Sequence, residues 1–372
     1  MFSGNKVFFS ISCSAVLLLT LGNAVPGFGD SSNTKQRTVT KLAEGVYEIR
    51  HADAPDTFPQ GNTTVIIGDR EVFVVDSCYL PSSAREDIAQ IHQWTSKPVR
   101  YLLNTHWHYD HTLGNVAYRE AFPGLEIIAH AETKRQMEGF NRGYVERYSA
   151  RAAGFQKTLD DGKNPNGNAL TEGEIADLKR AIRGIEPVGT EFKALSARVD
   201  DLTPDLTFDH ELNLNLGNRE VQIKFLGRAN TAGDAVVFLP KEKIVIVGDV
   251  LDHPIPYLGG GFPAEQIVTL KNVAKLQPQT IVPGHGDVLH DLAYLNLLTD
   301  FLQTVVSAVD KEMYDPASSK SAADMQKAVE KDIDVAAWRK KFAGDDKDDA
   351  DFFNDFSFSG VVTATYQQFR GR

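Results

Sequence analysis

The segment Thr105-His106-Trp107-His108-Tyr109-Asp110-His111 holds three histidines and one aspartate within six residues. A zinc site needs nitrogen and oxygen donors that converge to about 2.0–2.2 Å from the ion, and a catalytic site keeps one position open for water. The apolar stretch 99–103, predicted as a short strand, runs directly into this segment. A loop that leaves a strand can direct alternate side chains to one ion, so the sequence predicts a metal site here.

Ten short strands are predicted from alternating or continuous apolar patterns. They cover 46–49, 63–67, 72–75, 99–103, 125–129, 212–216, 221–226, 235–239, 244–247 and 280–282. Helices are expected at 82–94, 264–276, 292–313 and 321–342, and the acidic run 345–349 is expected to be a solvated bend. Strand-rich halves separated by helices favour two sheets packed face to face with helices outside.

The polar region from 131 to about 199 is predicted to be a helical insert, interrupted by the breaker-rich stretch 160–167. Its expected role is either a lid or wall beside the site, or a packing decoration. Gly248-Asp249 and Gly284-His285 also follow predicted strands, which adds two candidate ligands to the histidine segment.

The motifs at 105–115, 227–234, 239–240, 248–249 and 283–286 resemble, in type and order, those of the metallo-β-lactamase superfamily. This family includes β-lactamases, glyoxalase II, lactonases and phosphodiesterases. The resemblance covers 41–291 and implies an α/β fold, a four-layer αβ/βα sandwich with the metals at one edge of the sheets. The helical insert at 131–199 and a helical C-terminal extension at 292–372 would be additions to it.

The resemblance also implies a role for each matching residue. His106 and His108 would bind the first metal, and Asp110, His111 and His285 the second, with Asp249 bridging the two. Asn230 stands where the family usually has a third histidine of the first site. An asparagine carbonyl is a weak, hard donor, so zinc affinity at the first site should fall by at least about 10- to 100-fold.

Three outcomes stay open from this substitution: one metal at the second site, two ions with a weak or harder first metal, or metal binding without catalysis. The expected cofactor is therefore one or two zinc ions. In the catalytic cases, a bound ion lowers the pKa of water to about 7 and supplies hydroxide as the nucleophile. Asp110 or Asp249 would orient that water or carry its proton.

Other candidates lie near these motifs. His253 and Tyr257 follow Asp249 closely and are candidate substrate contacts, and His253 could also replace the missing ligand. Cys78 is expected to be a packed thiol, and no partner is expected for His51.

The N-terminus resembles a secretory signal peptide, with one lysine, an apolar run at 7–21 and small residues at 22–24. Cleavage is expected after residue 24, or as late as 29, and an uncleaved anchor is the alternative. Either case puts the folded part in the periplasm or outside the cell. Removal of this segment would leave Cys78 without a partner for an internal disulfide.

The chain has 372 residues, of which 42% are hydrophobic and 24% charged, as is ordinary for a globular protein. Its formal charge of −11 becomes −12 on losing Lys6, which argues against nucleic-acid binding. No interior membrane span is expected, and the oligomeric state is left open. A small molecule is the expected partner.

The expected function is an exported hydrolase that uses metal-bound hydroxide on a small ester, thioester, lactone or lactam. An aspartate at position 249 is more similar to glyoxalase II and the lactonases than to the β-lactamases, so antibiotic hydrolysis is not favoured. Two rivals remain: a metal-binding protein without catalysis, and an iron-dependent oxidoreductase of the same fold. Asn230 argues against the latter, because such enzymes take a ligand from that position.

Overall fold

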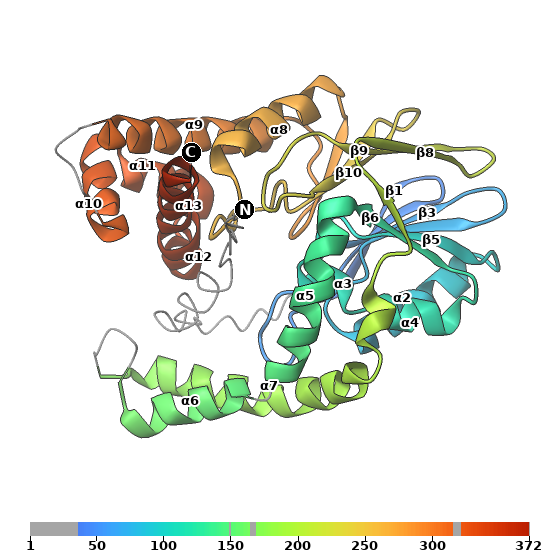
Figure 1. Ribbon diagram of the computed structural model, residues 1–372, viewed down its shortest axis with the longest axis horizontal. Coiled ribbons are helices and arrows are strands. Elements are labelled where there is room, and N and C mark those ends of the chain that lie inside the picture. The colour runs from blue at the N-terminus through green and yellow to red at the C-terminus, as the bar shows by residue number, and fades with distance from the viewer. Residues whose placement is uncertain (1–35, 149, 164–168, 315–320, 372) are drawn as a thin grey trace, which may run out of the picture.

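Two twisted sheets form the core of the fold and lie on the right in Figure 1. The computed structural model describes residues 36–148, 150–163, 169–314 and 321–371. In the described chain, the first sheet has the order β1 (Thr38–Ala43), β2 (Val46–Arg50), β3 (Thr63–Ile67), β4 (Val72–Val75), β5 (Val99–Leu103), β6 (Glu126–His130), β7 (Leu206–Phe208). The second has the order β12 (Thr280–Pro283), β11 (Ile244–Gly248), β10 (Ala235–Leu239), β9 (Glu220–Phe225), β8 (Glu211–Asn215).

Strand direction changes within each sheet. Strands β1 to β4 pair antiparallel, whereas β4 to β7 pair parallel. In the second sheet, β8 to β11 are antiparallel and β12 joins β11 in parallel. The parallel strands end at the same edge of each sheet, and these ends carry the loops with the predicted metal ligands.

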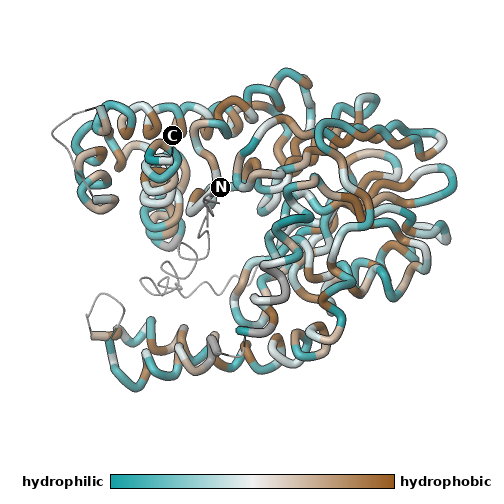
Figure 2. The backbone as a smooth tube through the Cα atoms, in the orientation of Figure 1, coloured by the Kyte–Doolittle hydropathy of each residue, from teal (hydrophilic) through white to brown (hydrophobic). Residues whose placement is uncertain are grey.

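Each sheet is covered on both faces. Apolar side chains such as Val75, Leu103 and Val237 form one core between the sheets. Strands β4 and β10 are apolar and buried throughout, because they are covered on both faces. Hydrophobic segments of the backbone gather in the sheet region of Figure 2. Helices α2 (Pro81–Trp94) and α4 (Asn115–Ala121) pack on the outer face of the first sheet. Helices α8 (Pro263–Lys275) and α9 (Ala293–Met313) pack on that of the second. The predicted four-layer sandwich is confirmed.

In the described residues of the insert, three α-helices are found, α5 (Ala131–Arg147), α6 (Ala150–Asp161) and α7 (Glu172–Ser196). Thr171 and Glu174 form a capping box that starts α7, so the helix begins after the predicted breaker stretch, of which 164–167 lie outside the described residues. The Tyr148 hydroxyl donates to Asp56 Oδ2 at 2.6 Å, which fixes α5 to the loop before β3.

The C-terminal extension is helical, as expected, but its details differ. The single helix expected at 321–342 is two, α10 (Ala322–Asp332) and α11 (Val335–Ala343), because Asp334 caps a new helix by accepting from Ala337 N at 2.9 Å. The acidic run is not a bend throughout: α12 (Lys347–Phe352) starts within it, capped by Asp346. A π-helix, η3 (Phe353–Phe358), and α13 (Ser359–Arg370) complete the chain.

Two N-terminal features bear on the predictions. Strand β1 starts at Thr38, so the folded region begins slightly before the predicted start at Lys41. The predicted signal peptide lies outside the described residues. Among the helices that are described, none is both long and apolar enough to span a membrane.

Arg219 ties the two sheets together at the end that carries the β8–β9 turn. Its guanidinium donates to Ile67 O at 2.8 Å and to Glu44 O at 2.7 Å, both in the first sheet. It also pairs with Glu242 at 3.0 Å, with both side chains about nine-tenths buried. One buried cation therefore satisfies acceptors from both layers.

We predict that Arg219→Ala lowers the free energy of unfolding by about 3 kcal/mol, because it leaves the buried Glu242 carboxylate and the carbonyls without their donor. Urea unfolding at a fixed metal concentration measures this. The matched control is Arg85→Ala, which removes an exposed pair with Glu120 and should cost less than about 1 kcal/mol. Equal losses in the two variants would show that Arg219 does not join the sheets.

Candidate metal centre

The histidine segment leaves β5 and turns into the short helix α3 (Tyr109–Thr112). Two side chains hydrogen-bond to its backbone: Asn104 Nδ2 and Ser77 Oγ each donate to His111 O at 3.2 Å. Asn115 Nδ2 donates to Asn104 Oδ1 at 2.8 Å, which fixes the amide of Asn104 in turn. The loop is thus rigid before any ligand is considered, and it presents four side chains toward the second sheet.

The second predicted ligand set lies in one cluster. His285 Nε2 is 3.1 Å from Asp110 Oδ2 and 3.2 Å from His111 Nε2. Asp249, at the end of β11, brings Oδ1 to 3.0 Å from His111 Nε2. The ligand atoms of Asp110, His111 and His285 all lie within 4.8 Å of one another, as one metal ion requires.

The first predicted set lies on the other side of Asp249. His106 Nε2 is 3.0 Å from His108 Nδ1 and 3.3 Å from Asp249 Oδ2. Asn230, in the loop between β9 and β10, places its amide 3.3 Å from His108 Nδ1 and 3.1 Å from Asp249 Oδ2. Asn230 therefore lies beside His108 and Asp249, with a neutral amide in place of an imidazole.

The residues present fit a divalent cation. Imidazole nitrogens face one another at 3.0 and 3.2 Å, although two lone pairs at that distance repel unless a proton or a metal lies between them. The buried Asp249 Oδ1 makes no hydrogen bond of acceptable geometry to any described residue. Burial lowers the pKa of His108 to about 3, so its ring is neutral at pH 7 and can donate a lone pair to a metal.

Asp76 supports a predicted ligand but was not among the residues predicted from the sequence. It directly follows β4, and its Oδ2 lies 2.9 Å from His111 Nδ1. It also accepts from Thr105 N and Thr105 Oγ1, each at 2.8 Å. A carboxylate behind a ligating histidine fixes the ring and raises its basicity. The available signal was a polar residue at the end of an apolar strand.

Asn62 and Gly61, which were not predicted from the sequence as site residues, fix the positions of two ligands. Asn62 Nδ2 donates to Pro283 O at 3.1 Å and to Gly286 O at 2.9 Å, and this holds the loop that carries His285. Gly61 lies against His111, where a Cβ would come within 2.4 Å of the ring. Any larger residue at position 61 would displace this ligand.

Asp252 adds a further buried carboxylate. Its side chain comes within ligand distance of Asp249 and His285, and its Oδ1 has no hydrogen-bond partner among the described residues. Burial and the charge of Asp249 raise its pKa well above the usual range. Asp252 was not among the metal ligands or substrate contacts predicted from the sequence.

The two candidate substrate contacts have different surroundings. Burial, together with the charges of Asp110 and Asp249, raises the pKa of Tyr257, which lies in the loop that η3 covers through Phe356. The ring of His253 packs edge-on against Tyr294 with centroids 4.8 Å apart. In the part of the chain that the structure describes, no group of possible metal ligands includes His253. The geometry thus gives no support to His253 as a replacement ligand.

The centre is open on one side. His285 keeps 22% of its side chain exposed, whereas His106 and His111 are fully buried. Tyr109 stacks on Tyr144 of α5 with centroids 3.6 Å apart, so the insert forms a wall beside the ligands.

Comparisons with known proteins lead to similar metalloproteins. A metallo-β-lactamase from Pontibacter korlensis shares 18% identity with a TM-score of 0.49, over 72% of this chain and 99% of that one. FIM-1 from Pseudomonas aeruginosa, in its mono-zinc form, shares 17% with a TM-score of 0.49, over 72% and 95%. The type 2 metallo-beta-lactamase of Elizabethkingia meningoseptica is 27% identical over 106 residues, 26% of this chain and 43% of that relative. The chain thus spans less than half of that curated relative's length.

The model of one protein family, described as the metallo-beta-lactamase superfamily, matches residues 56–285. This range covers more than half of the 372 residues and ends on the ligand candidate His285. It also includes the ends of β5, β11 and β12, which the predicted ligands follow. The chain belongs to the metallo-β-lactamase superfamily.

Proposed function

We propose that the protein is an exported hydrolase that acts on a small ester, thioester, lactone or lactam. Superfamily membership supports a metal-dependent hydrolase. The observation that carries the proposal is the complete second ligand set, in which Asp110, His111 and His285 converge beside Asp249 at the open side of the centre. A periplasmic or secreted location is proposed from the apolar run at 7–21 and the small residues after it.

The side chains suggest how such a hydrolase would work. A divalent ion held by this set would polarise a carbonyl group and lower the pKa of water to about 7. Asp110, with 11% of its side chain exposed, lies nearer the opening than Asp249 and is placed to accept a proton and return it to the leaving group. The raised pKa of Tyr257 keeps its phenol protonated at pH 7, so it can donate to a developing oxyanion.

Zinc-loaded protein should hydrolyse at least one member of a panel of esters, thioesters, lactones and lactams. We expect a chelator to abolish this activity and added zinc to restore it, and His285→Ala to lower kcat/KM at least 100-fold. His210→Ala, at an exposed position outside the centre, is the control and should retain activity. A metal-loaded sample that is inert on the whole panel would favour a binding protein without catalysis.

Asn230→His should tighten the first metal site by at least about 10-fold, because an imidazole replaces a weak amide donor beside His106 and His108. Competition with a chromophoric chelator gives both stepwise dissociation constants. Asn213→His, at an exposed position on β8, is the matched control and should leave both constants unchanged. If the wild type already binds two zinc ions tightly, the expected weakness of the first site is wrong.

Asp76→Asn should weaken zinc binding at the second site by about 10- to 100-fold, because a neutral amide no longer orients and polarises His111. The same competition titration measures this, and circular dichroism checks the fold. Asp69→Asn, in the exposed turn after β3, serves as the control. Unchanged zinc affinity in Asp76→Asn would show that this carboxylate supports the loop alone.

A further inference from the structure

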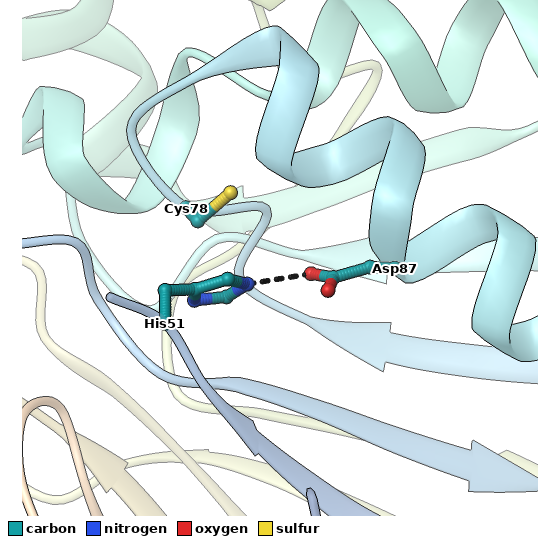
Figure 3. A group of neighbouring side chains, drawn as sticks. All are labelled: His51, Cys78 and Asp87. Atoms are coloured by element: carbon teal, nitrogen blue, oxygen red, sulfur yellow. Dashed lines mark hydrogen bonds and ion pairs between the residues drawn. The ribbon is translucent and has the colours of Figure 1, made fainter. Parts of the chain in front are cut away.

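A second group of metal-ligating side chains lies behind the centre, on the outer side of the first sheet. His51 follows β2, Cys78 lies in the loop after β4, and Asp87 is on α2 (Figure 3). All three are buried, with 3% or less of each residue exposed. The Cys78 sulfur, a His51 ring nitrogen and an Asp87 carboxylate oxygen lie within 4.8 Å of one another. The expectation that His51 has no partner is therefore wrong.

The contacts of the two His51 ring nitrogens indicate that a proton or a metal ion lies between His51 and Asp87. Its Nδ1 lies 2.8 Å from Gly61 O, and since a carbonyl only accepts, Nδ1 carries the proton. In the neutral ring, Nε2 then has a lone pair, which faces Asp87 Oδ2 at 2.8 Å. A lone pair and a carboxylate oxygen at this distance need a proton or a metal ion between them. Ligating histidines in proteins commonly bond their other nitrogen to a carbonyl in this way.

Cys78 completes a donor set suited to zinc. Its backbone has φ of 61°, a left-handed conformation that is uncommon outside glycine. Its sulfur lies within 4.8 Å of a His51 ring nitrogen and an Asp87 carboxylate oxygen, and it donates to Leu80 O at 3.6 Å. Zinc binds thiolate, imidazole and carboxylate together, and it deprotonates a bound thiol. Without an ion, burial raises the pKa of Cys78, so the thiol stays protonated.

Two neighbours agree with an ion at this position. Arg37 Nη2 contacts Asp87 Oδ1 at 3.0 Å, which leaves Oδ2 for one bond to a metal. The fully buried Tyr118 hydroxyl has no hydrogen-bond partner among the described residues, and the charges of Asp87 and Cys78 contribute to raising its pKa.

We propose that His51, Cys78 and Asp87 form a separate structural zinc site. It is closed to substrate because its members are buried, and it adjoins the centre through Gly61, whose carbonyl accepts from His51 and whose Cα face packs on His111. The site joins β2, the β4 loop and α2, so a bound ion would stabilise the scaffold on which His111 rests. This proposal does not depend on hydrolytic activity.

Cobalt substitution tests the proposal directly, because thiolate bound to Co²⁺ gives an intense charge-transfer band in the near ultraviolet. None of the proposed ligands of the metal centre is a sulfur atom, so the centre cannot produce this band. The test uses the full chain with Cys13→Ser, in which Cys78 is the sole thiol. We expect Co²⁺-loaded protein to show the band, and excess Zn²⁺ to remove it.

Adding Cys78→Ser should abolish the band, preserve the visible ligand-field bands of the centre and lower the bound metal by one equivalent. If that variant does not fold, the Cys13→Ser spectrum alone decides. Absence of the charge-transfer band in fully loaded Cys13→Ser protein would overturn the proposal. His51 and Asp87 would then share a proton, and Cys78 would be a packed thiol.

Discussion

The contact between Asp249 and the histidines of the β5 loop is the interaction on which the rest of the centre depends. Asp249 belongs to the second sheet, whereas His106 and His111 belong to the first, so the two sheets must meet with their parallel strand ends aligned. Burying several imidazoles and carboxylates together is costly unless their charges and lone pairs are satisfied. Asp76, Asn62 and the Asn104 network meet part of this cost with hydrogen bonds. A divalent ion would meet the rest.

Asn230 makes the two predicted metal sites unequal. Its amide donates to Asp249 Oδ2, the oxygen that also lies 3.3 Å from His106. An amide that donates to the shared carboxylate competes with an ion for that oxygen, in addition to being a weak ligand itself. The other oxygen, Oδ1, keeps no such partner and faces His111. Both effects favour occupation of the second site before the first.

Much of the fold could be predicted because its strands are short, apolar and closed by distinct turns. The strand 99–103 and its neighbours lie within about one residue of the prediction, since the central strands of the sheet are apolar and largely buried. The C-terminal helices were less predictable: Asp334 and Asp346 each cap a new helix, and an aspartate in a polar run looks the same whether it caps or is solvated. The ligand segment was recognisable because its residues are adjacent in sequence. Asp76 and Asp252 were not, because their roles arise only from long-range contacts.

The same reasoning explains why His51 had no partner in the sequence. Asp87 lies on a helix face and Cys78 in a strained turn, and neither pattern differs from ordinary packing. Asp76, Ser77 and Cys78 follow one another in the turn after β4. Asp76 contacts the His111 ring, while the Cys78 sulfur lies within 4.8 Å of a His51 ring nitrogen. His51 in turn bonds to Gly61, which packs on His111, so the turn and the Gly61 loop brace one ligand from two directions. Whatever cation lies between His51 and Asp87 therefore helps to set the position of His111.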